Sequence, residues 1–188
     1  MPNVLVPIAA GFEEIEAVTL IDVLRRGGID VIIGSLDHNM LVRGAHGIMI
    51  QADRSVIGLS ADELDMIVLP GGWGGTKALA FDSGIQSLLK SMDKQNKNIG
   101  AICAAPYALH AAGVLKEGYT CYPGIEDEID MAGFAGDKHA VVQSGNIMTS
   151  RGPATAICFA LAIVEKLVDP VTSSKLRADL LADNCAVS

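Results

Sequence analysis

The chain has 188 residues, of which 50% are hydrophobic, 19% charged and only 4% aromatic. These values predict one domain over residues 1–188 with a large aliphatic core, because chains of this size rarely divide. The formal net charge of −8 argues against nucleic acid or an anionic membrane as the main partner, and no apolar stretch is long enough to span a bilayer.

In chain order, short apolar strands alternate with longer helical segments. The first helix has acids in its first turn and Arg25 and Arg26 in its last turn, as is typical of helix ends. Residues 36–56 predict an antiparallel excursion at a sheet edge. The pattern predicts strands over 3–9, 31–34, 66–69, 99–102 and, more weakly, 119–122, a hairpin at 141–143 and 147–149, and helices over 12–26, 84–97, 104–112, 154–167 and 170–181.

Alternating helices and continuously apolar strands indicate an α/β fold, with a mostly parallel sheet covered on both faces. Ligands of such sheets bind at the carboxyl ends of the strands. The segments expected there are Gly11, the loop 70–75, Cys103, Tyr122 with Pro123, and residues 150–153.

Cys103 lies directly between the apolar run 99–102 and a helix-forming segment, with no turn residue between them. This layout is typical of a nucleophile elbow, and a thiol at a helix start is expected to have a lowered pKa. The alternative is a cysteine that only packs in the core.

Glu16 interrupts the apolar stripe of the first helix, next to Leu20 and Val23. A buried carboxyl group has a raised pKa, so Glu16 could stay protonated, donate a hydrogen bond to a thiolate and move a proton. The alternative is a solvated first-turn acid, which fits Glu13 and Glu14 better. The same helix is apolar nearly all round, which predicts a homodimer contact through residues 12–26, or else an internal helix.

The glycine-rich run 71–75 lacks the Gly-Lys-Ser/Thr ending of a phosphate loop, and Lys77 stands where a dinucleotide motif needs glycine. Its backbone N–H groups could instead form an oxyanion hole, with Gly72 and Ala104 beside Cys103. The alternative is an ordinary turn after a strand.

No histidine is tied by its spacing to Cys103, so a cysteine protease is disfavoured. The four histidines show no zinc-ligand spacing, and we expect no metal and no organic cofactor. Cys121, Cys158 and Cys185 are interpreted as packed, unpaired residues, which fits a reducing cytoplasm. The N-terminal apolar run lacks a preceding basic region and is expected to be a strand, not a signal peptide.

Four motifs in order resemble the ThiJ/PfpI superfamily, in the branch of the parkinsonism-associated protein deglycase and its bacterial relatives. The resemblance runs from residue 3 to about residue 168. Its motifs are Gly11-Phe12-Glu13-Glu14-Ile15-Glu16-Ala17, Val68-Leu69-Pro70-Gly71-Gly72, Ala101-Ile102-Cys103-Ala104-Ala105-Pro106 and Thr149-Ser150-Arg151-Gly152-Pro153-Ala154-Thr155.

The resemblance implies a flavodoxin-like three-layer sandwich, usually a homodimer, with Cys103 as the reactive cysteine and Glu16 as its protonated partner. It places the backbones of Gly71, Gly72 and Ala104 in the pocket. Further pocket candidates are Tyr122, His46, Arg151 and Pro153.

Family activities include cofactor-independent conversion of methylglyoxal or glyoxal to hydroxy acids, removal of early glycation adducts, chaperone activity and oxidation sensing. The leading hypothesis is therefore a glyoxalase or deglycase that acts on small carbonyls or glycated protein side chains. The rival is a redox sensor or chaperone in which Cys103 becomes a sulfinate.

The sequence also departs from family patterns. Ala104 replaces the histidine that follows the nucleophile in the protease-like branch, which puts peptidase activity in doubt. Tyr122-Pro123 occupies a loop where some members carry a histidine. His46 stands where many relatives place an arginine, so substrate preference is open.

Overall fold

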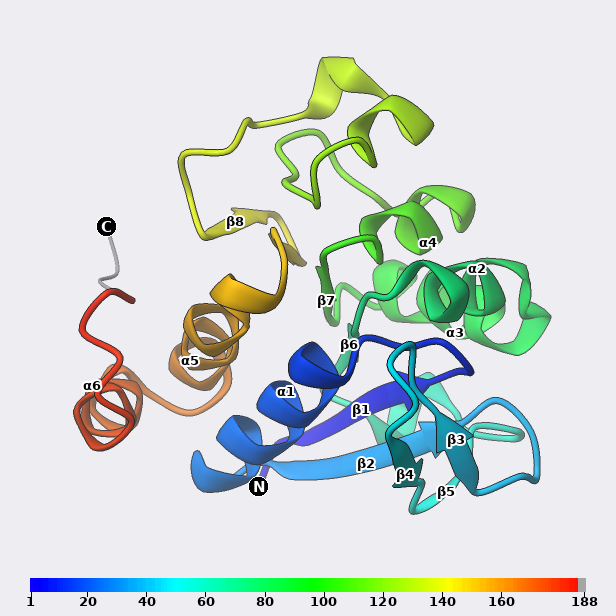
Figure 1. The fold of residues 1–188 in the computed structure, drawn as a ribbon, viewed down its shortest axis with the longest axis horizontal. Coiled ribbons are helices and arrows are strands. Elements are labelled where there is room, and N and C mark those ends of the chain that lie inside the picture. The colour runs from blue at the N-terminus through cyan, green and yellow to red at the C-terminus, as the bar shows by residue number, and fades with distance from the viewer. Residues whose placement is uncertain (186–188) are drawn as a thin grey trace.

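A seven-stranded sheet forms the centre of the computed structural model, which describes residues 1–185 (Figure 1). The strand order is β5-β2-β1-β6-β7-β9-β8, and only β8 runs antiparallel to its neighbour. The strands are β1 (Asn3–Ile8), β2 (Asp30–Ser35), β5 (Arg54–Ser55), β6 (Met66–Leu69), β7 (Asn98–Ile102), β8 (Val141–Ser144) and β9 (Ile147–Ser150). A separate antiparallel pair, β3 (Leu41–Arg43) and β4 (Met49–Gln51), forms the excursion expected within residues 36–56.

Helices cover both faces of the sheet, and successive residues of each strand point to opposite layers. Along β1, Val4 and Val6 pack into a core with α1 and α5, whereas Leu5 packs into a second core with α2, α3 and α4. The helices are α1 (Glu14–Arg26), α5 (Ala156–Leu167) and α6 (Pro170–Asp179) on one side, and α2 (Trp73–Phe81), α3 (Ser83–Lys94) and α4 (Pro106–Ala111) on the other. The expected flavodoxin-like three-layer sandwich is confirmed.

Two element predictions were wrong. Residues 119–122 form no strand and make only an isolated bridge between Tyr119 and Phe134. The glycine-rich run is not all loop, because α2 already begins at Trp73, directly after Gly72 with a φ of 84°. Glycine has a low helix propensity, and only the packing of α2 on the sheet overrides it here.

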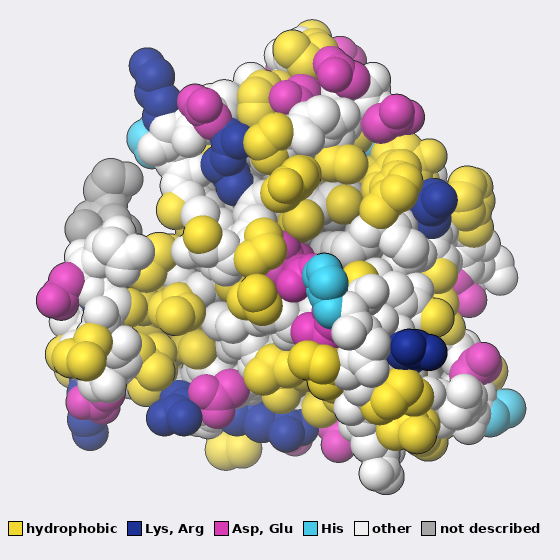
Figure 2. Space-filling view, viewed as in Figure 1, with side chains coloured by type: hydrophobic (Ala, Val, Ile, Leu, Met, Phe, Trp, Pro, Cys, Tyr) yellow, Lys and Arg dark blue, Asp and Glu magenta, His cyan; other side chains and the backbone are white. Residues whose placement is uncertain are grey.

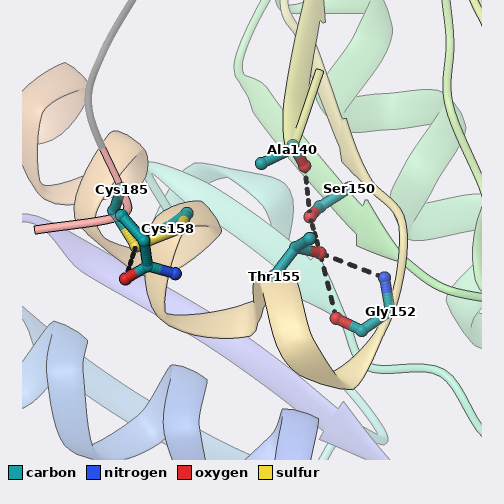
Figure 3. The surroundings of a disulfide bond; sticks show 7 residues. Ala140, Ser150, Gly152, Thr155, Cys158 and Cys185 are labelled. Atoms are coloured by element: carbon teal, nitrogen blue, oxygen red, sulfur yellow. Dashed lines mark hydrogen bonds between the residues drawn. A yellow bond between two sulfur atoms is a disulfide. The ribbon is translucent and has the colours of Figure 1, made fainter. Parts of the chain in front are cut away.

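The interpretation of Cys158 and Cys185 as unpaired residues was also wrong, because the two form a disulfide (Figure 3). They are 27 positions apart in the sequence. They meet because α6 reverses the chain direction and the segment after it returns to α5, which spacing cannot reveal. Within residues 1–185, no helix has the length and apolar composition needed to cross a membrane.

Candidate active site

Three neighbouring strands bring the predicted site residues to one edge of the sheet. β1, β6 and β7 lie side by side and run parallel, so the segments that leave their carboxyl ends meet. Glu16 lies in the first turn of α1, Gly71 and Gly72 follow β6, and Cys103 follows β7. The predicted convergence of these residues is therefore present.

Cys103 has a φ of 64°, in the left-handed region that a side chain other than glycine rarely adopts. Neighbouring segments hold this conformation: the N–H of Cys103 donates to the carbonyl of Ser150 at 3.0 Å, and its carbonyl accepts from the N–H of Tyr122 at 2.9 Å. This is the sharp turn of a nucleophile elbow, and it leaves Cys103 partly exposed at the end of the strand.

Gly71 allows the close approach of the two reactive side chains. A Cβ at this position would lie 2.6 Å from Cys103 Cβ, 2.7 Å from Glu16 Oε2 and 3.0 Å from Cys103 Sγ. The N–H of Gly71 donates to Glu16 Oε2 at 2.8 Å. Gly71 therefore both orients the carboxyl group and leaves room for it beside the sulfur.

Glu16 is fully buried, and burial raises the pKa of its carboxyl group to about 7. The N–H of Gly71 and the thiol of Cys103 oppose this shift without cancelling it. Its other oxygen, Oε1, is buried and has no hydrogen-bond partner among residues 1–185. An orphaned buried carboxyl oxygen favours the neutral acid, because the proton removes the unpaired charge.

The expected lowering of the Cys103 pKa was wrong. Burial, and next the charge of the Glu16 carboxylate, raise the pKa of this thiol to about 12. The N–H groups of Gly72 and Ala104 are directed at the sulfur and act in the opposite direction, but they are outweighed. The helix start therefore does not lower the pKa of Cys103 here, because burial of the thiol and the neighbouring Glu16 carboxylate outweigh it.

The two groups form one coupled pair, and these pKa values favour a Cys103 thiol beside a partly ionised Glu16 near neutral pH. Transfer of the thiol proton to the Glu16 carboxylate gives the minor form, in which the negative charge rests on sulfur and the N–H groups of Gly72 and Ala104 stabilise it. The arrangement can thus generate a nucleophilic thiolate and a neighbouring acid in the same step.

The further pocket candidates lie at different distances from this pair. Tyr122 is attached to the elbow through its backbone, and its exposed ring packs against Gly152. Pro153 begins the short 3-10 turn that precedes α5. Arg151 lies near Cys121, where its charge acts on that thiol, and its Nη1 is buried without a partner.

His46 contacts the acids that precede Glu16. The ring Nδ1 of His46 lies 3.0 Å from Glu14 Oε2 and 3.5 Å from Glu13 Oε2. The backbone N–H of His46 donates to Glu14 Oε1. The hydrogen bond to Glu14 raises the pKa of His46. For Glu14, burial acts to raise the pKa, but its hydrogen bonds prevail and lower it. These three side chains bring one ligand atom each within 4.8 Å of one another and could hold a cation, although the ion pair already accounts for their packing.

Sequence reasoning missed two side chains that support the elbow. Ser150 Oγ lies 2.7 Å from Thr155 Oγ1 and donates to the carbonyl of Ala140 at 2.7 Å, while Thr155 Oγ1 accepts from the N–H of Gly152. This network fixes the segment whose carbonyl binds the Cys103 N–H. The paired hydroxyl residues at the two ends of the 150–155 loop were the available signal.

The chain matches the family model described as "DJ-1/PfpI family" over residues 2–166. It is 40% identical over 181 residues to Protein dj-1beta of Drosophila melanogaster, covering 95% of this chain and 96% of that one. It is 38% identical over 168 residues to the Caenorhabditis elegans protein named Glutathione-independent glyoxalase DJR-1.2, covering 89% of each.

Among solved structures, Toxoplasma gondii DJ-1, titled as oxidized, superposes with a TM-score of 0.90 at 35% identity, covering 96% of this chain and 98% of that chain. The chain spans only 38% of the length of the Arabidopsis thaliana relative Protein DJ-1 homolog B. On the match to the family model and on these identities, the chain belongs to the DJ-1/PfpI family.

Proposed function

We propose that this protein is a cofactor-independent enzyme that converts 2-oxoaldehydes, such as methylglyoxal and glyoxal, to hydroxy acids through Cys103. The observation that carries the proposal is the fully buried Glu16 carboxyl group held beside Cys103 at the elbow, where a Cβ on Gly71 would touch both side chains. The name of the Caenorhabditis elegans relative supports the same reaction class. Early glycation adducts on protein side chains present related carbonyl chemistry and form the second substrate class.

The reaction begins from the form with the proton on Glu16. The Cys103 thiolate attacks the aldehyde carbon, a carbon–sulfur bond forms, and the carbonyl oxygen becomes an oxyanion that takes the Glu16 proton. The N–H groups of Gly72 and Ala104, which stabilise the negative sulfur, are near enough to stabilise this oxygen as it develops charge.

The Glu16 carboxylate then removes the hydrogen from the former aldehyde carbon as a proton and returns it to the adjacent carbon, while the hydroxyl proton on the first carbon passes to the oxygen of the adjacent carbonyl group. The product is a thioester, and water cleaves its carbon–sulfur bond: the hydroxyl group of water joins the acyl carbon, its other proton returns to Glu16, and the hydroxy acid and the thiolate are released. Each proton that leaves one carbon returns to the next, so no external oxidant or reductant is consumed. A carboxyl group with a pKa of about 7 suits both transfers, since it gives and takes protons at neutral pH.

The test is lactate formation from methylglyoxal by the pure protein without glutathione. Wild type should turn over, whereas Cys103→Ala and Glu16→Gln should each lose at least about a hundredfold in kcat/KM, in line with the removal of a nucleophile or general base. Cys121→Ser is the matched control, because it removes the other free thiol of the described residues, whose sulfur donates to Glu126 and not to Glu16. Equal rates for Cys103→Ala and wild type would disprove the mechanism.

Oxidation sensing is the second candidate, because the same groups would stabilise an oxidised sulfur. A sulfinate at Cys103 would accept hydrogen bonds from protonated Glu16 and from the Gly72 and Ala104 N–H groups. Selective uptake of oxygen at Cys103 under mild peroxide, with negligible carbonyl turnover, would favour sensing over catalysis.

We also propose a homodimer through α1. Ile15 and Val18 on α1 are 58% and 49% exposed, and Ile48 and Met49 at the neighbouring β3–β4 hairpin are 57% and 46% exposed. Hydrophobic side chains are spread over the face of the molecule that carries these elements (Figure 2). An exposed apolar patch of this kind is typical of a subunit interface. The cytoplasmic location stays a prediction, and the disulfide removes part of its support.

A further inference from the structure

The Cys158–Cys185 disulfide joins the first part of α5 to the segment that follows α6. Cys158 is partly exposed, whereas Cys185 is 7% exposed. Around the disulfide few hydrogen bonds link the two segments: Ser173 Oγ donates to the carbonyl of Leu161 at 2.9 Å, and the Cys185 N–H binds the carbonyl of Ala182 within its own segment. Ala182 is buried in the core that α5 forms, so apolar packing also holds this segment. Among the described residues, the disulfide is therefore the covalent link between residues 180–185 and α5, and it adds to the apolar packing of Leu180 and Ala182.

Both cysteines line a cavity of about 730 Å³ between β8, α5 and the C-terminal segment. This volume falls in the range of small-molecule sites. The disulfide is part of the cavity wall, so a small solute that enters can reach its sulfur atoms without unfolding the protein. Lys138 and Lys166 stand against a single acid, Glu165, among the charged lining residues, which favours an anionic solute.

The disulfide is also close to the network that supports the elbow (Figure 3). Cys158 lies one helical turn after Thr155, whose Oγ1 is 2.7 Å from Ser150 Oγ. The carbonyl of the same Ser150 accepts the N–H of Cys103 at 3.0 Å. A change at the start of α5 therefore has a short, bonded route to the backbone of Cys103.

We propose that Cys158–Cys185 is a thiol–disulfide exchange site for low-molecular-weight anionic thiols, and that its opening releases residues 180–185 and loosens the support of the Cys103 elbow. The exchange proceeds by attack of an external thiolate on the sulfur of Cys158, the more exposed of the two residues, which breaks the sulfur–sulfur bond and expels Cys185 as a thiolate that takes a proton.

A second external thiol then attacks the outer sulfur of the mixed disulfide at Cys158. It forms a low-molecular-weight disulfide and releases the Cys158 thiol. Overall the protein gains two electrons and two protons, and two external thiols are oxidised to one disulfide. The same low-molecular-weight disulfide drives the reverse reaction, so the site responds to the thiol–disulfide balance around it.

The first measurement is intact mass with amide hydrogen exchange, on the full chain before and after reduction by glutathione. Oxidised protein should show the disulfide. Its reduction should raise exchange in residues 180–185 and 150–158 by about tenfold or more, as expected for local release. Cys185→Ser should exchange like reduced wild type without any reductant, and Cys121→Ser should behave like wild type. Absence of the disulfide in oxidised protein, or equal exchange in both states, would overturn the proposal.

The second measurement separates this site from the proposed function, because it needs no carbonyl turnover. Peptide mass spectrometry follows alkylation of Cys103 by iodoacetamide, which should become about threefold faster or more once the disulfide opens. Release of residues 180–185 with unchanged Cys103 alkylation would overturn the coupling to the elbow.

The ligand class is tested with two thiols at equal thiolate concentration. Anionic glutathione should open the disulfide several-fold faster than neutral 2-mercaptoethanol. This difference in rate should shrink at high salt, and also in the double variant that carries both Lys138→Gln and Lys166→Gln. Trapped mixed disulfide should be found at Cys158. Equal rates for the two thiols would rule out the anionic class.

Discussion

Replacement of Glu16 by glutamine should change how the stability of this protein depends on pH. In the unfolded chain the carboxyl group titrates near its usual pKa of 4.5, whereas burial raises the pKa of the native group to about 7. Between these values the unfolded chain loses the proton that the native protein keeps. Protonated Glu16 therefore contributes stability that is fully present below pH 4.5 and is lost as the pH rises through about 7.

The magnitude follows from the width of that window. At about 1.4 kcal/mol per pKa unit, wild type should lose about 3 kcal/mol of unfolding free energy through this group between pH 4.5 and 7. Glutamine has a similar shape and does not titrate. The variant should accordingly be close to wild type at pH 4.5 and more stable than wild type by about 3 kcal/mol at pH 8.

Urea denaturation of both proteins at a series of pH values measures this difference. Glu14→Gln is the matched control from the same helix turn, since hydrogen bonds lower the pKa of Glu14 and its stabilisation is instead lost as the pH falls. Cys103→Ala should retain the wild-type trend, because burial is the largest cause of the Glu16 shift. Parallel stability curves for wild type and Glu16→Gln would refute the raised pKa.

Three other predictions concern the packing of the site, the subunit contact and the disulfide. Gly71→Ala places a Cβ 2.6 Å from Cys103 Cβ, so methylglyoxal turnover should fall at least about tenfold and the free energy of unfolding by about 1–3 kcal/mol. Turnover at the wild-type rate would contradict the close packing. Ile15→Asp should convert the proposed dimer to a monomer in light scattering, and an unchanged mass would exclude the α1 interface. Cys185→Ser should lower the free energy of unfolding by about 3.5 kcal/mol and the Tm by roughly 10 °C, because the unfolded chain regains the entropy of a loop of 27 residues. In calorimetry, a reductant should lower the Tm of wild type and leave that of the variant unchanged.

Much of the fold could be predicted because local patterns agree with the final packing. Continuous apolar strands such as residues 66–69 are buried on both faces and pair in parallel, as expected. The start of α2 at Trp73 was missed because its first residues include Gly74 and Gly75, whose low helix propensity is overridden by contact with α4 and the sheet. The predicted weak strand at 119–122 is absent although its residues favour β-structure, because within residues 1–185 the segment pairs only through one bridge to Phe134.

The identity of the site residues came from motifs, but their charge state did not. Cys103 and Glu16 could be named because an elbow and an interrupted apolar stripe are local patterns. Whether the shared proton lies on sulfur or on the carboxyl group depends on burial and on Gly71, 55 positions away from Glu16, which bonds its Oε2. For this reason the local argument from the helix start predicted the wrong direction for the thiol.

Pattern and composition indicated the layered α/β architecture and an elbow at Cys103, because each depends on residues close together in the chain, whereas the expectation of Glu16 beside Cys103 came from the resemblance to the family. The pairing of Cys158 with Cys185, the network from Thr155 through Ser150 to Cys103 and the raised pKa of both reactive groups were decided only by tertiary structure. Their physical cause is the same. Burial and short distances between segments far apart in sequence set these properties, and neither is encoded in any single stretch of the chain.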